Sequence, residues 1–310
     1  MQRKRKRRFG VVLRKRWRRM RRRIDYRRFL PFLAFLIIGV TGLSMLIGYA
    51  VESAARRREN ERLAQIRLQE TPQPEVRTEI SEEIIPVSAE AVPVGEKRSY
   101  HSLDGEISDR MLEIYRQNSD LIGWLQIDGV VDLPVVYRDN EYYLTHSFTG
   151  REDSGGTLFL DQAHPMAEET QNLVIHGHNM RDSSMFGILS NYNKLAVLKN
   201  HAFAEFSTLY SVEEYVVFAV LRVNTDPESD EYFNYTGTPQ FVDDADFYRY
   251  TDEVKNRSMF DIPVDVQPTD AILTLATCVE DDRLAVFLRK IRPGETKDAL
   301  QEQVDQAFKR

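Results

Sequence analysis

An unbroken run of 23 uncharged residues, Phe29 to Val51, is the feature that most constrains how this chain folds. As an α-helix the run would measure about 35 Å at roughly 1.5 Å per residue, enough to cross a hydrocarbon core of about 30 Å. It is longer than the apolar segment of a signal peptide, roughly 7 to 15 residues, and no clear small-residue cleavage site follows it. The sequence therefore predicts one transmembrane helix over residues 29–51, in preference to a cleaved signal peptide or a buried soluble helix.

Basic residues gather on one side of this run. Sixteen of the 42 Lys and Arg residues lie within residues 1–28, beside a single acid, Asp25. Such an arm could bind nucleic acid or anionic lipid, and the adjoining apolar run favours the membrane over nucleic acid. Because fewer basic residues follow the run, the positive-inside bias predicts a single-pass cell-membrane protein with residues 1–28 in the cytoplasm. Anionic-lipid binding and simple enforcement of topology both remain open as roles for the arm.

The chain beyond the run has two parts, both expected outside the cytoplasm. Residues 52–104 begin as a charged helical continuation and then become rich in Pro and Glu, which is typical of a flexible linker. Residues 105–310 form the predicted folded domain, opening with an amphipathic helix that Ser108 would cap.

Short β-rich runs dominate the predicted domain. They are WLQI, LPVVY, TLFLD, NLVIHG, YVVFAVLRV, AILTLAT and RLAVFLRKI. Separated by turn residues, these seven runs predict a mainly β domain with a closed or nearly closed, antiparallel-rich sheet. Two helices are expected between them, over Ser184 to Tyr192 and Asp243 to Ser258.

The chain has one cysteine, Cys278, at the end of the run AILTLAT. A structural cysteine in an oxidising compartment normally has a partner, so this thiol is buried and inert, intermolecular, or a nucleophile. Arg283 opens the next run, where a short excursion between strands would bring its charge back to the thiol. Ion pairing of Arg283 with Glu280, Asp281 or Asp282 is an equally open interpretation.

Six histidines compete for an acid/base role, and two of them stand out. His101, at the linker boundary, and His164 and His201, in polar loops, are expected to be solvated. His176 and His178 end a strand-like run in the segment IHGHNM and would share a face if the strand persisted. The six are His101, His146, His164, His176, His178 and His201.

Signatures of metal or cofactor binding are weak in this sequence. A pair formed by His176 and His178 could ligate zinc, but there is no HExxH and only one cysteine. No GxGxxG after a strand, no P-loop and no GxSxG occurs. We therefore expect neither a metal nor a cofactor.

Several segments together resemble the sortases, and class B sortases in particular. TLATC, followed after a short acidic loop by Arg283, is similar to the TLxTC and downstream Arg of that family. NSDLIGWLQIDG, LPVVYRDNEYYLTHSF, GGTLFLD, GHNM followed by SMFG, and RSMFDIPV occur in the family's order. The resemblance covers about residues 105–292 and implies an eight-stranded β-barrel with an N-terminal helical addition and a helix inserted between late strands.

The resemblance also implies roles for individual residues. The family's nucleophile falls on Cys278, its general acid/base on His178 and its oxyanion-stabilising arginine on Arg283. Thr277 matches the neighbourhood of the substrate groove, and His176, where the family need not have histidine, is interpreted as structural or groove-lining.

A class B sortase is a cysteine transpeptidase, related to thiol proteases, and the resemblance implies its reaction here. It would cleave an LPxTG- or NPxTN-like sorting signal of a secreted protein through a thioester, then pass the acyl group to a peptidoglycan amine in a Gram-positive wall. Transfer to a pilin Lys and hydrolysis by water are alternative outcomes. A membrane-tethered binding domain with an inert Cys278 is the non-catalytic alternative, which thiol alkylation would distinguish.

Overall fold

The computed structural model describes residues 26–68, 107–164, 170–229, 232–237, 240–279 and 282–310. It forms two compact units, residues 1–54 and residues 55–310. The first 25 residues of the basic arm, His101 and residues 69–104 of the predicted linker lie outside the described residues. The predicted boundaries of arm, span and linker therefore stay predictions.

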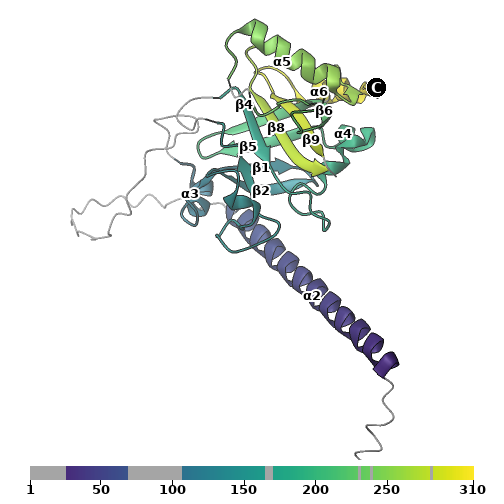
Figure 1. Ribbon diagram of the computed structural model, residues 1–310. Coiled ribbons are helices and arrows are strands. Elements are labelled where there is room, and N and C mark those ends of the chain that lie inside the picture. Colours follow the sequence, from purple (N-terminus) through teal and green to yellow (C-terminus); the bar gives the residue numbers. More distant parts are fainter. Residues whose placement is uncertain (1–25, 69–106, 165–169, 230–231, 238–239, 280–281) are drawn as a thin grey trace, which may run out of the picture. The chain divides into compact units, whose positions relative to one another are not determined.

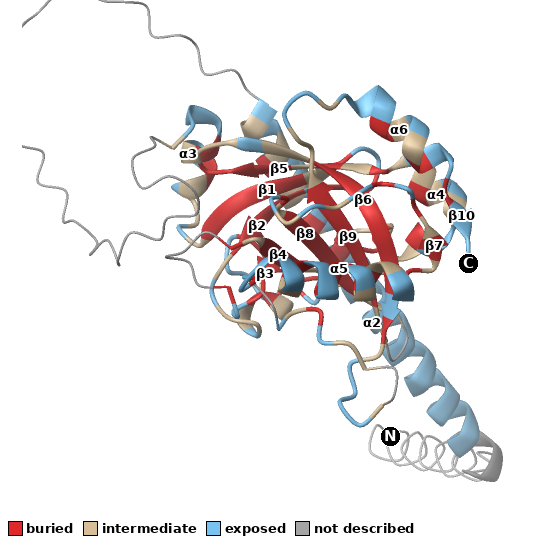
Figure 2. Cartoon of the chain, turned by 90° about the horizontal axis from the view of Figure 1, so that it is seen from above, coloured by how far each residue is buried: buried red, intermediate tan, exposed pale blue. Residues whose placement is uncertain are grey.

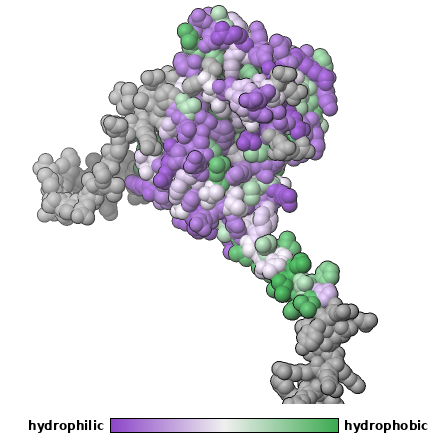
Figure 3. All heavy atoms as spheres, in the orientation of Figure 1, coloured by the Kyte–Doolittle hydropathy of each residue, from purple (hydrophilic) through white to green (hydrophobic). Residues whose placement is uncertain are grey.

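Helix α2, Tyr26–Leu68, contains the apolar run and contributes to both units. By length and composition it is able to cross a membrane, with a mean hydropathy of 2.3 in its most apolar window. Figure 3 shows hydrophobic side chains in green along this helix, whereas hydrophilic residues dominate the visible surface of the domain. The Thr41 hydroxyl donates to the Ile37 carbonyl at 2.9 Å, so this polar group is satisfied within the helix, as a lipid environment requires.

Eight strands form the closed barrel that the resemblance implied, in the order β1-β2-β3-β4-β8-β9-β6-β5 (Figure 1). Two neighbouring pairs, β2 with β3 and β4 with β8, are parallel, and the other pairs are antiparallel. The strands are β1 Leu121–Ile127, β2 Val131–Val136, β3 Leu158–Leu160, β4 Asn172–His176, β5 Phe203–Thr208, β6 Val212–Val223, β8 Ile272–Val279 and β9 Asp282–Lys290.

The seven predicted runs each overlap a barrel strand, and the eighth strand of the barrel, β5, was missed. Its sequence FAEFST is short and half polar, so hydrophobicity alone does not mark it. The strand forms because β1 and β6 hydrogen-bond to its two edges and so close the barrel.

Helices and one small sheet surround the barrel. The helical elements are α3 Asp109–Tyr115, η1 Tyr142–Leu144, η2 Leu189–Asn193, α4 Leu195–Asn200, α5 Asp244–Arg257 and α6 Lys297–Asp305, and the small sheet pairs β7 Phe260–Asp261 with β10 Phe308–Lys309. The helix predicted after Ser108 is confirmed as α3, although Ser108, at its N-terminal cap position, makes no side-chain capping hydrogen bond. The prediction from Asp243 is confirmed as α5, where the Asp243 carboxylate caps the helix by accepting from the Asp246 amide at 2.8 Å.

The helical piece predicted over Ser184 to Tyr192 is confirmed only from Leu189 onward, as a 3-10 helix, and is wrong for the residues before it. The chain makes tight turns there, followed by the 3-10 helix η2. Ser183 and Met185 have φ of 64° and 53°, in the left-handed region, and this backbone cannot continue into a right-handed α-helix.

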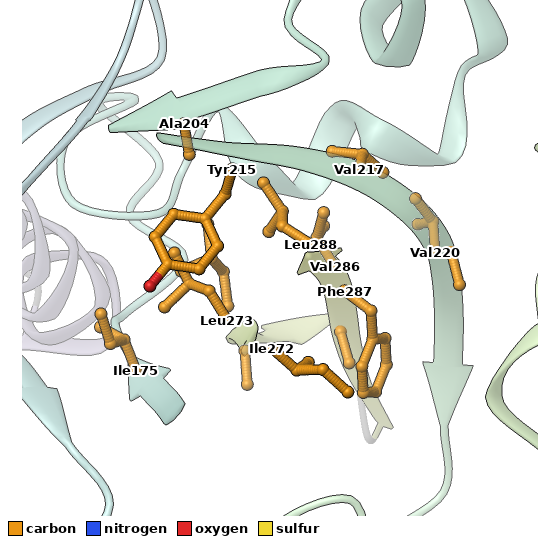
Figure 4. Close-up of a cluster of buried hydrophobic side chains, with 14 of the residues drawn as sticks. Ile175, Ala204, Tyr215, Val217, Val220, Ile272, Leu273, Val286, Phe287 and Leu288 are labelled. Atoms are coloured by element: carbon orange, nitrogen blue, oxygen red, sulfur yellow. The ribbon is translucent and has the colours of Figure 1, made fainter. Parts of the chain in front are cut away.

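The barrel strands consist largely of buried residues, drawn in red in Figure 2, and their apolar side chains form the main core cluster. Ile175, Leu273 and Phe287 are fully buried in a cluster drawn from β4, β8 and β9 (Figure 4). A second cluster includes Leu63 of α2 together with Ile114 and Trp124. The end of α2 therefore packs against the barrel, although the sequence placed these residues in the linker.

His164 is fully buried, so the expectation that it is solvated is wrong. The Val174 amide donates to His164 Nε2 at 2.9 Å, which requires a lone pair on that nitrogen. Burial lowers the pKa of this imidazole to about 4.

We expect His164 to make the domain less stable in acid. Between pH 6.5 and 4 the unfolded chain binds a proton that the folded chain does not, so stability falls as pH falls. Relative to His164→Gln, whose amide oxygen can still accept from Val174, the wild type should lose about 3 kcal/mol more over this range. Urea unfolding at several pH values measures the difference, and parallel pH dependences for the two proteins would contradict it.

Candidate active site

A cavity of about 260 Å³ opens where β4 and β8 end. All five residues to which the sequence assigned a role line it. The lining residues are Asn140, Leu144, Phe159, Asp161, His176, Gly177, His178, Thr225, Tyr235, Ala276, Thr277, Cys278 and Arg283.

Cys278 and Arg283 face each other across the antiparallel pair of β8 and β9. The short excursion between these strands returns the arginine opposite the thiol, as the sequence spacing predicted. Arg222 Nε donates to the Asp282 carboxylate at 2.5 Å, so this acid is already paired with another arginine. Glu280 and Asp281 lie outside the described residues, and with the residues that the structure does describe Arg283 forms no ion pair.

Tyr235 lines the same cavity as Arg283, near enough for the arginine charge to act on its phenol. Burial raises the pKa of Tyr235 to about 12, although the arginine charge opposes this rise. The phenol is therefore neutral at physiological pH.

His178 follows the end of β4 and lies half-buried at the cavity. Its Nε2 lies 2.8 Å from the Leu144 carbonyl oxygen. A carbonyl can only accept, so Nε2 carries the proton and Nδ1 holds the lone pair of the neutral ring. The Leu144 carbonyl thus fixes the ring orientation and tautomer, as the third group of a catalytic triad does.

Three hydrogen bonds join the segment around His178 to the end of β8. The Gly177 amide donates to the Ala276 carbonyl at 3.2 Å, and the Thr277 hydroxyl donates to the Gly177 carbonyl at 2.8 Å. The Asn179 amide group donates to the Cys278 carbonyl at 2.9 Å. One backbone–backbone bond and two bonds from side chains to backbone carbonyls consequently fix the histidine segment to the cysteine strand.

His176 lines the same cavity as His178 but has a different hydrogen-bond partner. Its Nε2 lies 2.8 Å from the Asp161 carboxylate, whose second oxygen accepts from the Ala163 amide at 2.8 Å. Burial would raise the pKa of Asp161, but hydrogen bonds from His176 and Ala163 outweigh it, so the pKa is lowered. No group of three or more His, Cys, Asp or Glu able to hold a metal occurs within the described part of the chain.

Sequence reasoning missed Leu144, Asp161 and Tyr235. Leu144 acts through its carbonyl, which every residue has, so no side-chain signal marks it. Asp161 ends the predicted run TLFLD and could have been found as a polar residue at a strand end. Tyr235 lies in an irregular segment between β6 and α5, where no periodicity predicts which side chains turn inward.

Comparison with known proteins gives a consistent result. No protein-family model matches the chain. It is 33% identical over 179 residues to the sortase B of Listeria monocytogenes, covering 57% of this chain and 70% of that protein. The Staphylococcus aureus sortase B–substrate complex matches with a TM-score of 0.55 and 26% identity, over 61% of this chain and 88% of that one. A sortase B complexed with triglycine matches with a TM-score of 0.54 and 26% identity, over 60% and 86%. The chain therefore belongs to the class B sortases, which are cysteine transpeptidases.

Proposed function

We propose that this transpeptidase is anchored in the cell membrane and attaches secreted proteins to the cell wall, with Cys278 as its nucleophile. His178 is the general acid and base, and Arg283 stabilises the oxyanion. The observation that carries this proposal is the cross-strand pairing of Cys278 with Arg283 beside a cavity that His178 also lines.

In the first half-reaction the Cys278 thiolate attacks the carbonyl carbon of the Thr residue in a C-terminal sorting signal. The carbonyl π electrons move onto oxygen, where the permanently charged guanidinium of Arg283 stabilises them. The tetrahedral intermediate then collapses and the peptide C–N bond breaks. His178, which starts this half-reaction as the imidazolium partner of the Cys278 thiolate, gives its Nδ1 proton to the leaving amine and becomes neutral. A thioester on Cys278 remains.

In the second half-reaction an incoming amine attacks the thioester. Neutral His178 accepts the proton of that amine through the ring nitrogen that the Leu144 carbonyl leaves free, Nδ1. Arg283 again stabilises the oxyanion, the C–S bond breaks, and the Cys278 thiolate is regenerated. The products are a new amide bond and an enzyme in its starting state.

The substrates follow from the reaction and from the related structures. Complexes of sortase B with a substrate and with triglycine support a sorting-signal peptide, of LPxTG or NPxTN type, as acyl donor and a peptidoglycan amine as acceptor. Thr277 and His176 would line the groove for the signal, since both border the cavity. His176 and Asp161 would present a polar wall to the bound peptide.

Helix α2 would tether the enzyme in the membrane. Its apolar run is long enough to span, and the basic residues before that run favour a cytoplasmic N-terminus. The domain would then lie on the outer face, where secreted proteins emerge.

Mass spectrometry of the full-length chain in detergent tests this function. The protein is incubated with LPxTG- and NPxTN-like peptides, with and without triglycine as the amine. We expect a covalent adduct on Cys278 that disappears when the amine is added, together with an amide-linked product. An adduct that resolves only onto water would favour hydrolysis, and no adduct from a folded chain would favour a binding domain.

A further inference from the structure

The end of helix α2 inserts an arginine between two loops of the domain. Arg56 has only 2% of its side chain exposed. One guanidinium nitrogen bonds the carboxylate of Asp153, which is 1% exposed, and another lies 3.5 Å from the carboxylate of Asp182, which is 8% exposed. A single buried cation therefore joins two buried acids from separate loops, within the unit formed by residues 55–310.

The Asp153 loop supports the carbonyl that orients His178. The Asp153 amide donates to the Thr145 carbonyl at 2.9 Å, and the Gly156 amide donates to the Asp153 carbonyl at 3.0 Å. Gly156 has a φ of +61°, and a Cβ atom there would lie 2.9 Å from the Leu144 carbonyl oxygen. The turn held by Arg56 thus lies directly against the Leu144 carbonyl.

The Asp182 loop supports His178 itself. The Asp182 carboxylate accepts from the Ser184 amide at 3.1 Å and from the Ser184 hydroxyl at 2.6 Å, which closes the turn. Two residues later the Phe186 amide donates to the His178 carbonyl at 2.9 Å. This turn therefore folds back onto the histidine backbone.

We propose that Arg56 is a positioning residue for the transpeptidase reaction, clamping the two loops so that the Leu144 carbonyl and the His178 imidazole stay in register. The inference rests on the catalytic role proposed for His178. It makes the last turns of α2 part of the catalytic unit as well as an attachment to the membrane segment.

Charge explains why the clamp matters. A buried carboxylate that loses its cation is strongly unfavourable, and two such carboxylates also repel each other. The exposed Arg57 also donates to the Asp182 backbone carbonyl at 3.1 Å and lies 4.0 Å from its carboxylate, whereas Arg56 joins both acids. Without the Arg56 guanidinium, the Asp153 and Asp182 loops would separate or take up water. Either movement would carry the Leu144 carbonyl away from His178, and misplacement by about 1 Å is enough to cost about 100-fold in rate.

The same helix offers a matched control at Arg67. Its guanidinium lies 5.3 Å from the centre of the Trp124 ring and 3.8 Å from the Glu205 carboxylate. These partners belong to β1 and β5, and neither of them borders the cavity. Arg67→Met therefore repeats the substitution on the same helix without touching either loop.

The test compares steady-state transpeptidation by the full-length wild type, Arg56→Met and Arg67→Met in detergent. We expect kcat of Arg56→Met to fall about 10- to 100-fold, with KM for the sorting peptide within about twofold of wild type. KM is retained because the cavity walls formed by Phe159 and Tyr235 are unchanged. Arg67→Met should keep the wild-type kcat.

Arg56→Lys keeps the test decisive if Arg56→Met does not fold. An ammonium still compensates the buried acids but, as a single point charge, cannot bridge both loops as the planar fork does. Its kcat should also fall at least about fivefold at unchanged KM. Wild-type kcat in Arg56→Lys, or equal losses in Arg56→Met and Arg67→Met, would overturn the inference alone. An inactive wild type would overturn the proposed function and this inference with it.

Discussion

Cys278→Ala is expected to form no thioester and to release no C-terminal fragment from a sorting peptide. The chain contains no second cysteine, so no other thiol can take over the attack. The loss of turnover should exceed about 1000-fold, as for removal of other covalent nucleophiles. Mass spectrometry of the protein and chromatography of the released peptide measure the two outcomes.

The fold of this variant should survive, because Cys278 is only half-buried and its backbone contacts are unchanged. A similar thermal midpoint for variant and wild type would confirm that the loss is chemical. Alkylation of the wild-type thiol should reproduce the loss. A covalent peptide adduct on Cys278→Ala would place the nucleophile on another residue, and an unreactive wild-type thiol would favour the binding-domain interpretation.

The strands that carry the site could be predicted because burial leaves a pattern in the sequence. Strands β8 and β9 are apolar over most of their length, and the short segment that connects them is acidic. Cys278 and Arg283 therefore had to lie near a strand end, and the close spacing brought them opposite each other. Helix α5 could also be predicted from the sequence, since Asp243 is a good capping residue.

Features that depend on distant parts of the chain could not be predicted. Arg56 and Asp153 are 97 positions apart, and His178 and Leu144 are 34 apart. No local pattern connects such partners, and a buried arginine in the sequence looks like any exposed one. His164 illustrates the same limit, because its polar neighbours suggested solvent while the fold buries it completely.

The local sequence also gave a wrong prediction where the backbone takes an unusual conformation. The run from Ser184 to Tyr192 has helix-like spacing, but the chain needs a turn that returns to His178. Asp182 closes that turn and Met185 adopts a left-handed conformation within it. Tertiary contacts therefore override the local preference at the point where His178, the proposed general acid and base, must be fixed.

Replacing Arg283 with lysine tests whether geometry or charge alone stabilises the oxyanion. Arg283 borders the cavity with a planar fork of N–H donors, one of which approaches the Asp282 carbonyl at 3.5 Å. A lysine keeps the positive charge but, as a flexible point donor, cannot present the planar set of N–H donors that the guanidinium offers to the oxyanion. We expect kcat of Arg283→Lys to fall by about 100- to 1000-fold, the usual cost of one oxyanion donor, with KM little changed.

Arg222→Lys is the matched control, because Arg222 is a half-exposed arginine on the neighbouring strand that pairs with the Asp282 carboxylate. Its turnover should equal that of the wild type, since exposed ion pairs contribute little and Arg222 does not border the cavity. Single-turnover measurement of thioester formation in both variants separates the first chemical step from product release. Near wild-type acylation by Arg283→Lys would show that a positive charge suffices, and the oxyanion would then need a different donor, such as a backbone amide.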